Sequence, residues 1–350
     1  MIDLENLIKN LSEASGVSAK EKTPKDIVKQ ELSKMQIEVK EDRVGNLIGF
    51  EKQKRNIGKI MIATHIDEIG LMVTNFDENL LRFTTVGGID KKILLGQEVT
   101  VYGSKPLKGV IGSIPPHFQP KEKQKEPFTI DDLFIDVGLS EKELKRTVKV
   151  GDFISFSKKC VKLLNNRYSG KSFDNRVGVA ALLYTFQEMK HFKHNWDIYG
   201  VFTVQEEITG LGASSATYSI SPDVGIAIDA TFGKQSDFPP DYSVEIDKGP
   251  VIAVGPNIHT GLRKYIVKIA KEYEIPFQLE AEPGLTGTDA AEIQVSRLGV
   301  PTLLISIPLL YMHTPIETIS IADIKRTGRL IAIFLSKLTR ELLKGDKYAT

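Results

Sequence analysis

Five side chains that can bind a metal ion stand where an apolar, strand-like run gives out or a helix-like stretch begins. They belong to His65, Asp174, Glu207, Asp229 and His313. In open α/β sheets the strands deliver functional side chains at their carboxyl ends, so residues far apart in the sequence can meet in one crevice. We therefore expect these side chains to converge, with Asp174 arriving from the start of a helix.

The apolar runs before these residues have the composition of buried strands. They cover residues 59–64, 198–205, 224–228 and 302–307. Taken singly, Asp174 has a structural explanation as a helix cap and Asp229 as a turn residue. The adjacent Glu206 and Glu207 can likewise be solvated charges. A metal site explains all of them together, whereas a structural explanation must be supplied for each one separately.

His65 is followed two residues later by Asp67, whose carboxylate can accept the other proton of the imidazole. A carboxylate placed behind a metal-binding histidine fixes the tautomer of the ring and raises its basicity. We predict this orienting role for Asp67.

The ligand count favours a pair of bridged ions. Two histidines and three carboxylates are too few for two separate four-coordinate sites, but they suffice if one carboxylate bridges two ions. Bridged ions about 3.5–4 Å apart are the recurrent two-metal arrangement. Three carboxylates and one hydroxide neutralise two divalent cations. Glu206 is then left for catalysis, because neighbouring side chains on an extended chain point to opposite faces.

The composition of the 350-residue chain argues against several classes of partner. Lys and Arg number 46 and Asp and Glu 45, for a net charge of +1, so no overall field favours nucleic acid or an anionic membrane. The one cysteine, Cys160, can form neither an internal disulfide nor a cysteine metal cluster. No apolar run nears the roughly 20 residues that a membrane span needs. We expect a soluble, cytoplasmic protein.

Hydrophobic periodicity predicts an α/β fold in which helices flank a mixed sheet. A first helix is expected from Leu4 and a second around Pro24. Residues 37–50 alternate as a hairpin does, and residues 59–64 are apolar on both faces, like a central strand. The last helix is expected to begin near Ser320.

Residues 67–161 show a different sequence pattern. Short strand-like pieces alternate there with glycine turns, and no long helical pattern occurs. We predict an inserted, smaller β-rich domain at 67–161 and a discontinuous catalytic domain made of residues 1–66 and 162–350. The charged, proline-bounded segment 120–127 is expected to be a solvated, mobile loop.

Six motifs, in order along the chain, resemble those of the tetrahedral (TET) aminopeptidases, dinuclear metallopeptidases that include glutamyl and deblocking aminopeptidases. The motifs are His65-Ile66-Asp67-Glu68-Ile69-Gly70, Asp174-Asn175-Arg176, Gln205-Glu206-Glu207, Asp229-Ala230-Thr231, Gly287-Thr288-Asp289-Ala290 and Tyr311-Met312-His313-Thr314-Pro315-Ile316-Glu317. The likeness extends over essentially the whole chain, inserted segment included.

The resemblance implies a zinc-peptidase-like catalytic domain that binds two divalent metal ions, with Asp174 as the bridge. It assigns His65 and Asp229 to one ion, and Glu207 and His313 to the other. Imidazole and carboxylate ligands suit Zn²⁺ first, with Co²⁺ or Mn²⁺ as alternatives.

The resemblance further implies that Glu206 is the general base and that Asp67 orients His65. It assigns a wall of the substrate pocket to Gly287, Thr288 and Asp289. It also implies a tetrahedral homododecamer, built from dimers through the inserted domain, that admits only short peptides.

Two departures from the family pattern affect loops rather than ligands. The glycine expected two residues after Glu207 is shifted by one, to Gly210, and Leu310 stands where a basic residue is common. The shape of the loop after Glu207 is therefore in question.

The leading function is that of an aminopeptidase. Two ions lower the pKa of a shared water, and Glu206 takes its proton and passes it to the leaving amine, so that the metal-bridging hydroxide attacks the peptide carbonyl. The alternatives are a related metal-dependent amidohydrolase and a non-catalytic binding or assembly protein on the same fold.

The remaining histidines are expected to be structural. His117 is interpreted as a turn or interface residue, and His191 and His194 as solvated. His259 stays open between a structural role and a supporting role near the active site.

Overall fold

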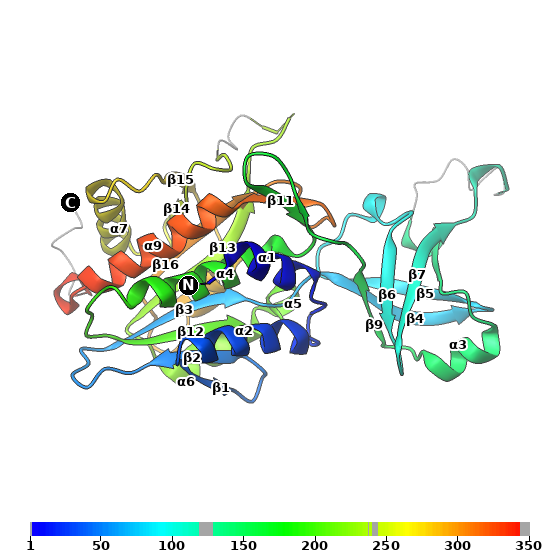
Figure 1. Ribbon diagram of the computed structural model, residues 1–350, viewed down its shortest axis with the longest axis horizontal. Helices are drawn as coiled ribbons and strands as arrows, with labels where there is room; N and C mark the ends of the chain where they lie inside the picture. The colour runs from blue at the N-terminus through cyan, green and yellow to red at the C-terminus, as the bar shows by residue number, and fades with distance from the viewer. Residues whose placement is uncertain (1, 119–128, 237, 240–243, 344–350) are drawn as a thin grey trace.

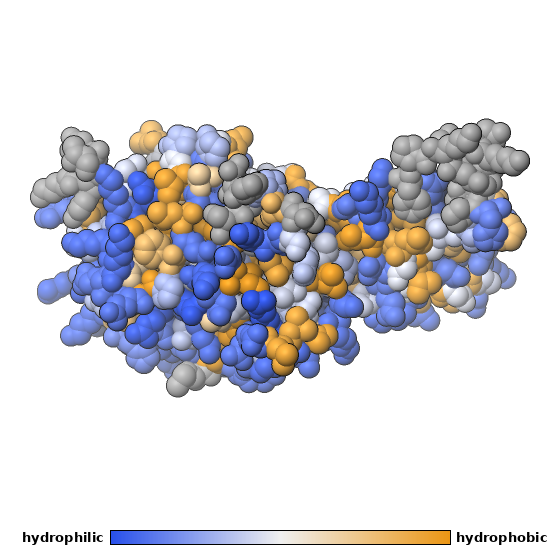
Figure 2. Space-filling model, turned by 90° about the horizontal axis from the view of Figure 1, so that it is seen from above, coloured by the Kyte–Doolittle hydropathy of each residue, from blue (hydrophilic) through white to orange (hydrophobic). Residues whose placement is uncertain are grey.

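The computed structural model describes residues 2–118, 129–236, 238–239 and 244–343. They form a large lobe, in which helices flank a mixed sheet, and a smaller lobe made mainly of strands (Figure 1). Figure 2 shows the two lobes joined by a narrower waist. The predicted α/β fold with an inserted, smaller β-rich domain is confirmed.

The main sheet consists, in spatial order, of β1 (Glu38–Glu41), β2 (Leu47–Glu51), β12 (Asp197–Thr203), β3 (Lys59–His65), β13 (Val224–Phe232), β16 (Thr302–Leu309), β14 (Val251–Val254) and β15 (Gln278–Ala281). β12, β3, β13 and β16 run parallel, whereas β2 joins β12, and β14 joins β16, in antiparallel fashion. The carboxyl ends of the four parallel strands therefore meet at one edge of the sheet.

Helices cover both faces of this sheet. They are α1 (Leu4–Glu13), α2 (Lys22–Lys34), α4 (Phe173–Met189), α6 (Leu211–Ile220), α7 (Thr260–Glu272), α8 (Asp289–Gln294) and α9 (Ile321–Lys337). Among the described residues, no helix combines the length and the apolar character needed to cross a lipid bilayer.

Two glycines show how closely α4 and α8 approach opposite faces of the sheet. A Cβ at Gly200 would lie 2.5 Å from the ring of Phe186 in α4, and one at Gly225 would lie 2.5 Å from Ile293 in α8. Gly200 pairs with Ile62 and Gly225 with Met61. Because successive residues of a strand face opposite sides, the two helices lie on different faces.

Local sequence signals account for several element boundaries. The Asp3 side chain accepts a hydrogen bond from the backbone N–H of Asn6 at 3.2 Å and so caps α1, and Ser320 caps α9. The predicted hairpin at residues 37–50 is confirmed by the antiparallel pairing of β1 with β2. Asp42 closes its turn, because Oδ1 accepts from the N–H groups of three following residues.

The small lobe is a closed barrel. Its strands are, in spatial order, β4 (Gly70–Asp77), β5 (Leu80–Val86), β8 (Leu133–Asp136), β7 (Pro106–Ser113), β6 (Glu98–Tyr102) and β9 (Phe153–Phe156). Its apolar core, built from residues such as Val73, Leu81 and Ile135, is separate from the core of the large lobe. The helix α3 (Glu141–Thr147) packs Leu144 into it. The segment 120–127, interpreted above as a loop, lies outside the described residues.

Short elements complete the chain. A small sheet joins β10 (Val161–Lys162), β11 (Arg167–Gly170) and β17 (Glu317–Ser320), and the 3-10 turns are η1 (Lys91–Ile93), η2 (Pro116–Phe118), η4 (Ile130–Asp132) and η5 (Arg340–Leu343). Because β11 follows the barrel in sequence and β17 precedes α9, this sheet ties the re-entering chain to the large lobe.

Candidate metal centre and active site

Two parallel strands bring His65 and Asp229 together. His65 is the last residue of β3, and the pairing of Ala227 with Ala63 sets Asp229 level with it. Contrary to prediction, Asp229 does not end its strand, because β13 continues to Phe232 by pairing with the longer β16. Its side chain nevertheless reaches the expected edge.

Asp174 enters the site from the start of α4, but it does not cap the helix. Its backbone is extended, with φ −78° and ψ 107°. The capping side chain is that of Asn175, whose Oδ1 accepts from the N–H of Gly178 at 3.1 Å. The interpretation of Asp174 as a helix cap is therefore wrong, and its carboxylate is available for other partners.

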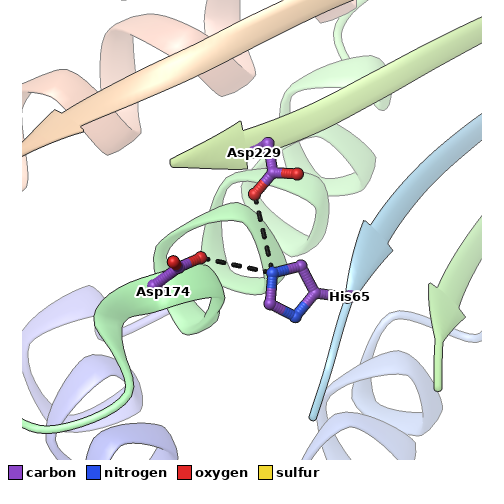
Figure 3. Close-up of side chains that lie close together, drawn as sticks. All are labelled: His65, Asp174 and Asp229. Atoms are coloured by element: carbon purple, nitrogen blue, oxygen red, sulfur yellow. Dashed lines mark hydrogen bonds and ion pairs between the residues drawn. The ribbon is translucent and has the colours of Figure 1, made fainter. Parts of the chain in front are cut away.

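The first candidate ligand group comprises His65, Asp174 and Asp229. Figure 3 shows both carboxylates pointing at the same imidazole nitrogen. The Nε2 of His65 lies 3.2 Å from Oδ1 of Asp174 and 3.6 Å from Oδ1 of Asp229. All three side chains are buried, so these ligand atoms converge in a desolvated space.

The second candidate group comprises Asp174, Glu207 and His313. The Nε2 of His313 lies 3.1 Å from Oδ2 of Asp174 and 3.6 Å from Oε2 of Glu207. Each oxygen of Asp174 therefore faces a different histidine. The structure brings together all five predicted metal ligands, in two groups that share Asp174.

The two adjacent glutamates both face this space. After β12 ends at Thr203, the chain turns through Gln205 in the left-handed region, with φ 60°, and begins the short helix α5 (Glu206–Thr209). This turn replaces the extended backbone assumed above. Glu206 belongs to neither ligand group, and its Oε2 lies 3.8 Å from Nε2 of His65.

The shifted glycine, Gly210, ends α5. It has a φ of 63°, in the left-handed region that glycine adopts without strain. The loop after Glu207 is thus a tight turn between α5 and α6, and Glu207 remains directed at His313.

Burial and mutual repulsion govern the charges of the cluster. Burial raises the pKa of Glu206 to about 10 and that of Glu207 to about 8, and nearby carboxylates add to both effects. Burial opposes a charge on His313, but its hydrogen bond to Asp174 and the charge of that carboxylate raise its pKa to about 9. In the protein alone, protons thus balance the carboxylates, and divalent cations bound here would replace those protons.

The donor atoms fit such cations. Each group offers imidazole nitrogen and carboxylate oxygens that all lie within 4.8 Å of one another, the donor types that zinc, cobalt and manganese accept. The Oε1 of Glu207 is buried without a hydrogen-bond partner. A buried carboxylate oxygen without a partner is costly, so this atom also favours a bound cation.

Asp67 supports the site through backbone groups. Its carboxylate accepts from the N–H of Glu206 at 3.1 Å, from the N–H of Glu207 at 3.3 Å and from the Ser18 hydroxyl at 2.6 Å. Its Oδ1 lies 3.5 Å from Nδ1 of His65, a buried nitrogen that makes no hydrogen bond within the described part of the chain. Asp67 therefore stands where an orienting residue would, and it also fixes the two glutamates.

Glu317 is a supporting residue that the sequence analysis did not single out. Its buried carboxylate accepts from the backbone N–H of Asp174 at 3.1 Å and from that of His313 at 2.8 Å. In the sequence, only its position four residues after His313 in the last motif pointed to a role at the site. Its link to Asp174 could not be read from the sequence, because the two residues lie far apart in the chain.

A cavity of about 580 Å³ opens over the two ligand groups. Gly287 and Thr288, which the family resemblance assigns to a wall of the substrate pocket, line this cavity, and Gly88 of the small lobe also reaches it. Asp289 does not line it: this side chain is buried and accepts from the Thr203 hydroxyl at 2.5 Å. Asp289 lies outside the cavity wall, and its negative charge is one of those that raise the pKa of Glu206.

The other histidines lie outside the cavity. His259 caps α7, because its Nδ1 accepts from the N–H of Leu262 at 3.2 Å. His191 is exposed, as predicted, and His117 lies in η2. The prediction for His194 is wrong: its side chain is only 4% exposed, and its Nδ1 lies 3.0 Å from the carbonyl oxygen of Trp196.

Similarity to known proteins now identifies the family. A family model described as M42 glutamyl aminopeptidase matches residues 45–330. The chain belongs to the M42 peptidase family. A relative of this M42 peptidase, the lysyl aminopeptidase of Pyrococcus furiosus, is 37% identical over 344 residues, which make up 97% of this chain and 98% of the relative.

Solved structures share the fold of this M42 peptidase over nearly its full length. The TET aminopeptidase of Thaumarchaeota archaeon SCGC AB-539-E09 superposes with a TM-score of 0.92 at 31% identity, over 98% of this chain and 99% of that one. The TET1 peptidase of Pyrococcus horikoshii, which can assemble into a tetrahedron or a large octahedral shell, gives 0.84 at 32% identity, over 96% and 100%. The resemblance to the TET aminopeptidases is confirmed.

Its family and its structural relatives identify this M42 peptidase as a metallo-aminopeptidase, a hydrolase that acts on peptide bonds. The family is metal-dependent, and the two ligand groups are candidate positions for the metal. The closed assemblies formed by a TET relative support self-association of this chain.

Proposed function

We propose that this M42 peptidase is a dinuclear aminopeptidase that removes amino-terminal residues from short peptides, with Glu206 as its general base. One observation carries the proposal: two groups of ligand atoms meet at a single carboxylate, and each oxygen of that carboxylate faces a different histidine. A shared carboxylate of this kind suits two ions held close together.

Asp174 would bridge the two ions, with His65 and Asp229 on one, and Glu207 and His313 on the other. Divalent cations, when bound, supply Lewis acidity that lowers the pKa of a water molecule and polarises the scissile carbonyl. We favour Zn²⁺, with Co²⁺ or Mn²⁺ as alternatives, because all three accept imidazole and carboxylate.

Glu206 lies beside the two ligand groups but belongs to neither. It accepts a proton from the attacking water and delivers it to the nitrogen of the leaving amine. Its buried position, which raises its pKa to about 10 in the protein alone, favours retention of that proton, and neighbouring cations would lower the value toward the working range. Asp67 keeps Glu206 in place through its backbone N–H.

Gly287 and Thr288, which line the cavity, are proposed to contact the peptide. The buried Asp289 has no place in that wall, so its contribution to substrate binding would be indirect, through the charge that it exerts on Glu206.

The direct test is hydrolysis of amino-acid p-nitroanilides by the metal-loaded protein, with a chelator as control. Activity that chelation abolishes and that Zn²⁺ or Co²⁺ restores supports the aminopeptidase. Turnover of acylated amino acids alone would favour a related amidohydrolase. Metal binding without turnover of any substrate would favour a binding or assembly protein.

The two lobes are proposed to have separate roles. We propose a catalytic domain of residues 1–66 and 162–350 and a dimerisation domain of residues 67–161, since the barrel has its own apolar core. By similarity to TET relatives, we further propose a tetrahedral dodecamer built from dimers, in a cytoplasmic location that agrees with the free thiol of Cys160. Sedimentation analysis of the full chain tests the assembly.

A further inference from the structure

The cavity over the metal centre contains a second acidic group. Glu280 lies on β15, and Glu282 follows the end of that strand. Both line the same cavity as Glu206 and Glu207, yet neither belongs to a candidate ligand group. The cavity opens over the two candidate ligand groups, so a substrate held at the metal centre would also reach these two carboxylates.

The orientation of β15 is unusual for the edge strand of a sheet. Glu280 and Glu282 face the cavity and are partly buried, whereas Ala281 between them is exposed and Leu279, just before Glu280, is 50% exposed. An edge strand normally presents its charged residues to water and its apolar residues to the protein. Turning carboxylates inward is unfavourable unless a partner compensates their charge.

No cationic side chain among the described residues provides that compensation. Glu280 accepts one hydrogen bond, from the hydroxyl of Thr231 at 2.8 Å, and no lysine or arginine lines the described part of the cavity. Burial raises the pKa of both glutamates, and the charge of Glu280 adds to the effect on Glu282. A raised pKa is expected for a carboxylate that is partly buried and has no positive partner.

The proposed metal ions do not supply the missing charge. Two divalent cations bring four positive charges, and the three carboxylate ligands together with the hydroxide counted above bring four negative ones. The metal centre is then balanced, and Glu280 and Glu282 retain their own negative charges. The cavity therefore favours a substrate that carries a positive charge at this position.

The spacing along β13 indicates which part of a substrate reaches them. Thr231, which bonds Glu280, lies two residues beyond the ligand Asp229, a separation of about 6.6 Å along a strand. The four-carbon stem of lysine, or the longer side chain of arginine, can span such a gap. The apolar side chains of Leu304 and Met312 line the same cavity and can contact that stem.

We propose that Glu280 and Glu282 determine specificity, selecting peptides whose amino-terminal residue is lysine or arginine. This inference rests on the proposed aminopeptidase function, which supplies the position of that residue. The two carboxylates bind the ammonium or guanidinium group of its side chain, while the α-amino group and the scissile bond lie at the metal centre.

The test compares p-nitroanilides of lysine, arginine, leucine and glutamate, using the metal-loaded full chain and its Glu280→Gln/Glu282→Gln variant. We expect the kcat/KM for lysine to exceed that for leucine by about tenfold or more, the scale of a charge-assisted hydrogen bond. In the double variant the ratio of kcat/KM for lysine to that for leucine should fall to about one, with metal still bound. Glu272→Gln, an exposed position on α7, is the matched charge control.

Two results would overturn the inference while leaving the aminopeptidase intact. One is a wild-type enzyme that cleaves leucine as well as lysine. The other is an equal loss of lysine and leucine activity in the double variant, which would assign the two glutamates to the α-amino group instead.

A protein that hydrolyses none of these substrates contradicts the proposed function rather than the specificity. Calorimetry then decides the inference, with L-lysine and L-norleucine as probes on the cobalt-loaded chain, because norleucine has the same stem without the ammonium group. Tighter binding of lysine that disappears in Glu280→Gln/Glu282→Gln supports the proposal, and equal binding overturns it.

Discussion

Glu317 holds the backbone of Asp174, because its Oε2 accepts the Asp174 N–H at 3.1 Å. The other oxygen of the same carboxylate accepts the N–H of His313 at 2.8 Å. One buried side chain thus positions the shared ligand of the centre and a ligand from a different loop. Neither bond uses the metal-binding atoms, so Glu317 acts on the geometry of the centre rather than on its chemistry.

Replacing Glu317 by alanine is therefore expected to weaken metal binding about 10–100-fold, the usual effect of removing a group that positions ligands. Titration of the apo-protein with Zn²⁺ in a competing chelator measures the affinity. Glu317→Gln keeps one accepting oxygen and should lose less. Wild-type affinity in the alanine variant would show that the two backbone bonds are dispensable.

The convergence of the candidate ligands could be predicted in part, because strand geometry sets the level of several of them. The apolar runs before His65 and the glutamate pair correspond to β3 and β12, whose ends pair at Thr203 and His65. Asp229 lies inside β13 and still reaches the same edge, because the parallel register, rather than the strand end, fixes its level.

The supporting contacts could not be predicted in the same way. Asp67 bonds the backbone of Glu206 and Glu207, and Glu317 bonds that of Asp174, across separations of more than 100 residues. Such contacts depend on how loops pack, and no local periodicity encodes them. The role of Glu280 and Glu282 could not be predicted for a related reason, because it depends on which side of the edge strand β15 faces the cavity.

The adjacent glutamates should respond differently to the same substitution. Glu206→Gln is expected to retain metal and to lower kcat by several orders of magnitude, because the amide cannot accept the proton of the attacking water. Glu207→Gln removes a ligand from one group and should reduce bound metal. Metal analysis and steady-state kinetics on both variants separate the two roles. Near-normal turnover by metal-loaded Glu206→Gln would refute its assignment as the base.

Asp174 and Asp229 should differ in how many ions their loss releases. Asp174→Asn removes a carboxylate common to both ligand groups, whereas Asp229→Asn affects only one. We expect the first variant to bind neither ion under conditions that saturate the wild type, and the second to retain one. Elemental analysis after dialysis gives the stoichiometry. Equal metal loss in both variants would argue against a bridging role for Asp174.

Glu68 is expected to stabilise the junction between the lobes. Its buried carboxylate accepts from the N–H of Gly16 at 2.8 Å and from the hydroxyl of Ser155 in the barrel at 3.0 Å, and it pairs with Lys171 of the large lobe. Glu68→Gln leaves the Lys171 charge buried without its partner. We expect the free energy of unfolding to fall by about 3–5 kcal/mol, measured in urea, with the exposed Glu38→Gln as control.

The pH dependence of that loss gives a second test. Burial alone would raise the pKa of Glu68, but the charges of Lys171 and Arg176 outweigh it and hold the pKa below the usual value of 4.5. Because the folded pKa lies below the unfolded one, the stabilisation is complete above pH 4.5 and is lost as the pH falls through the folded value. Burial also lowers the pKa of Lys171, which affects only the alkaline side. The stability difference between wild type and Glu68→Gln should therefore shrink on acidification, and a difference that grows there would contradict the ion pair.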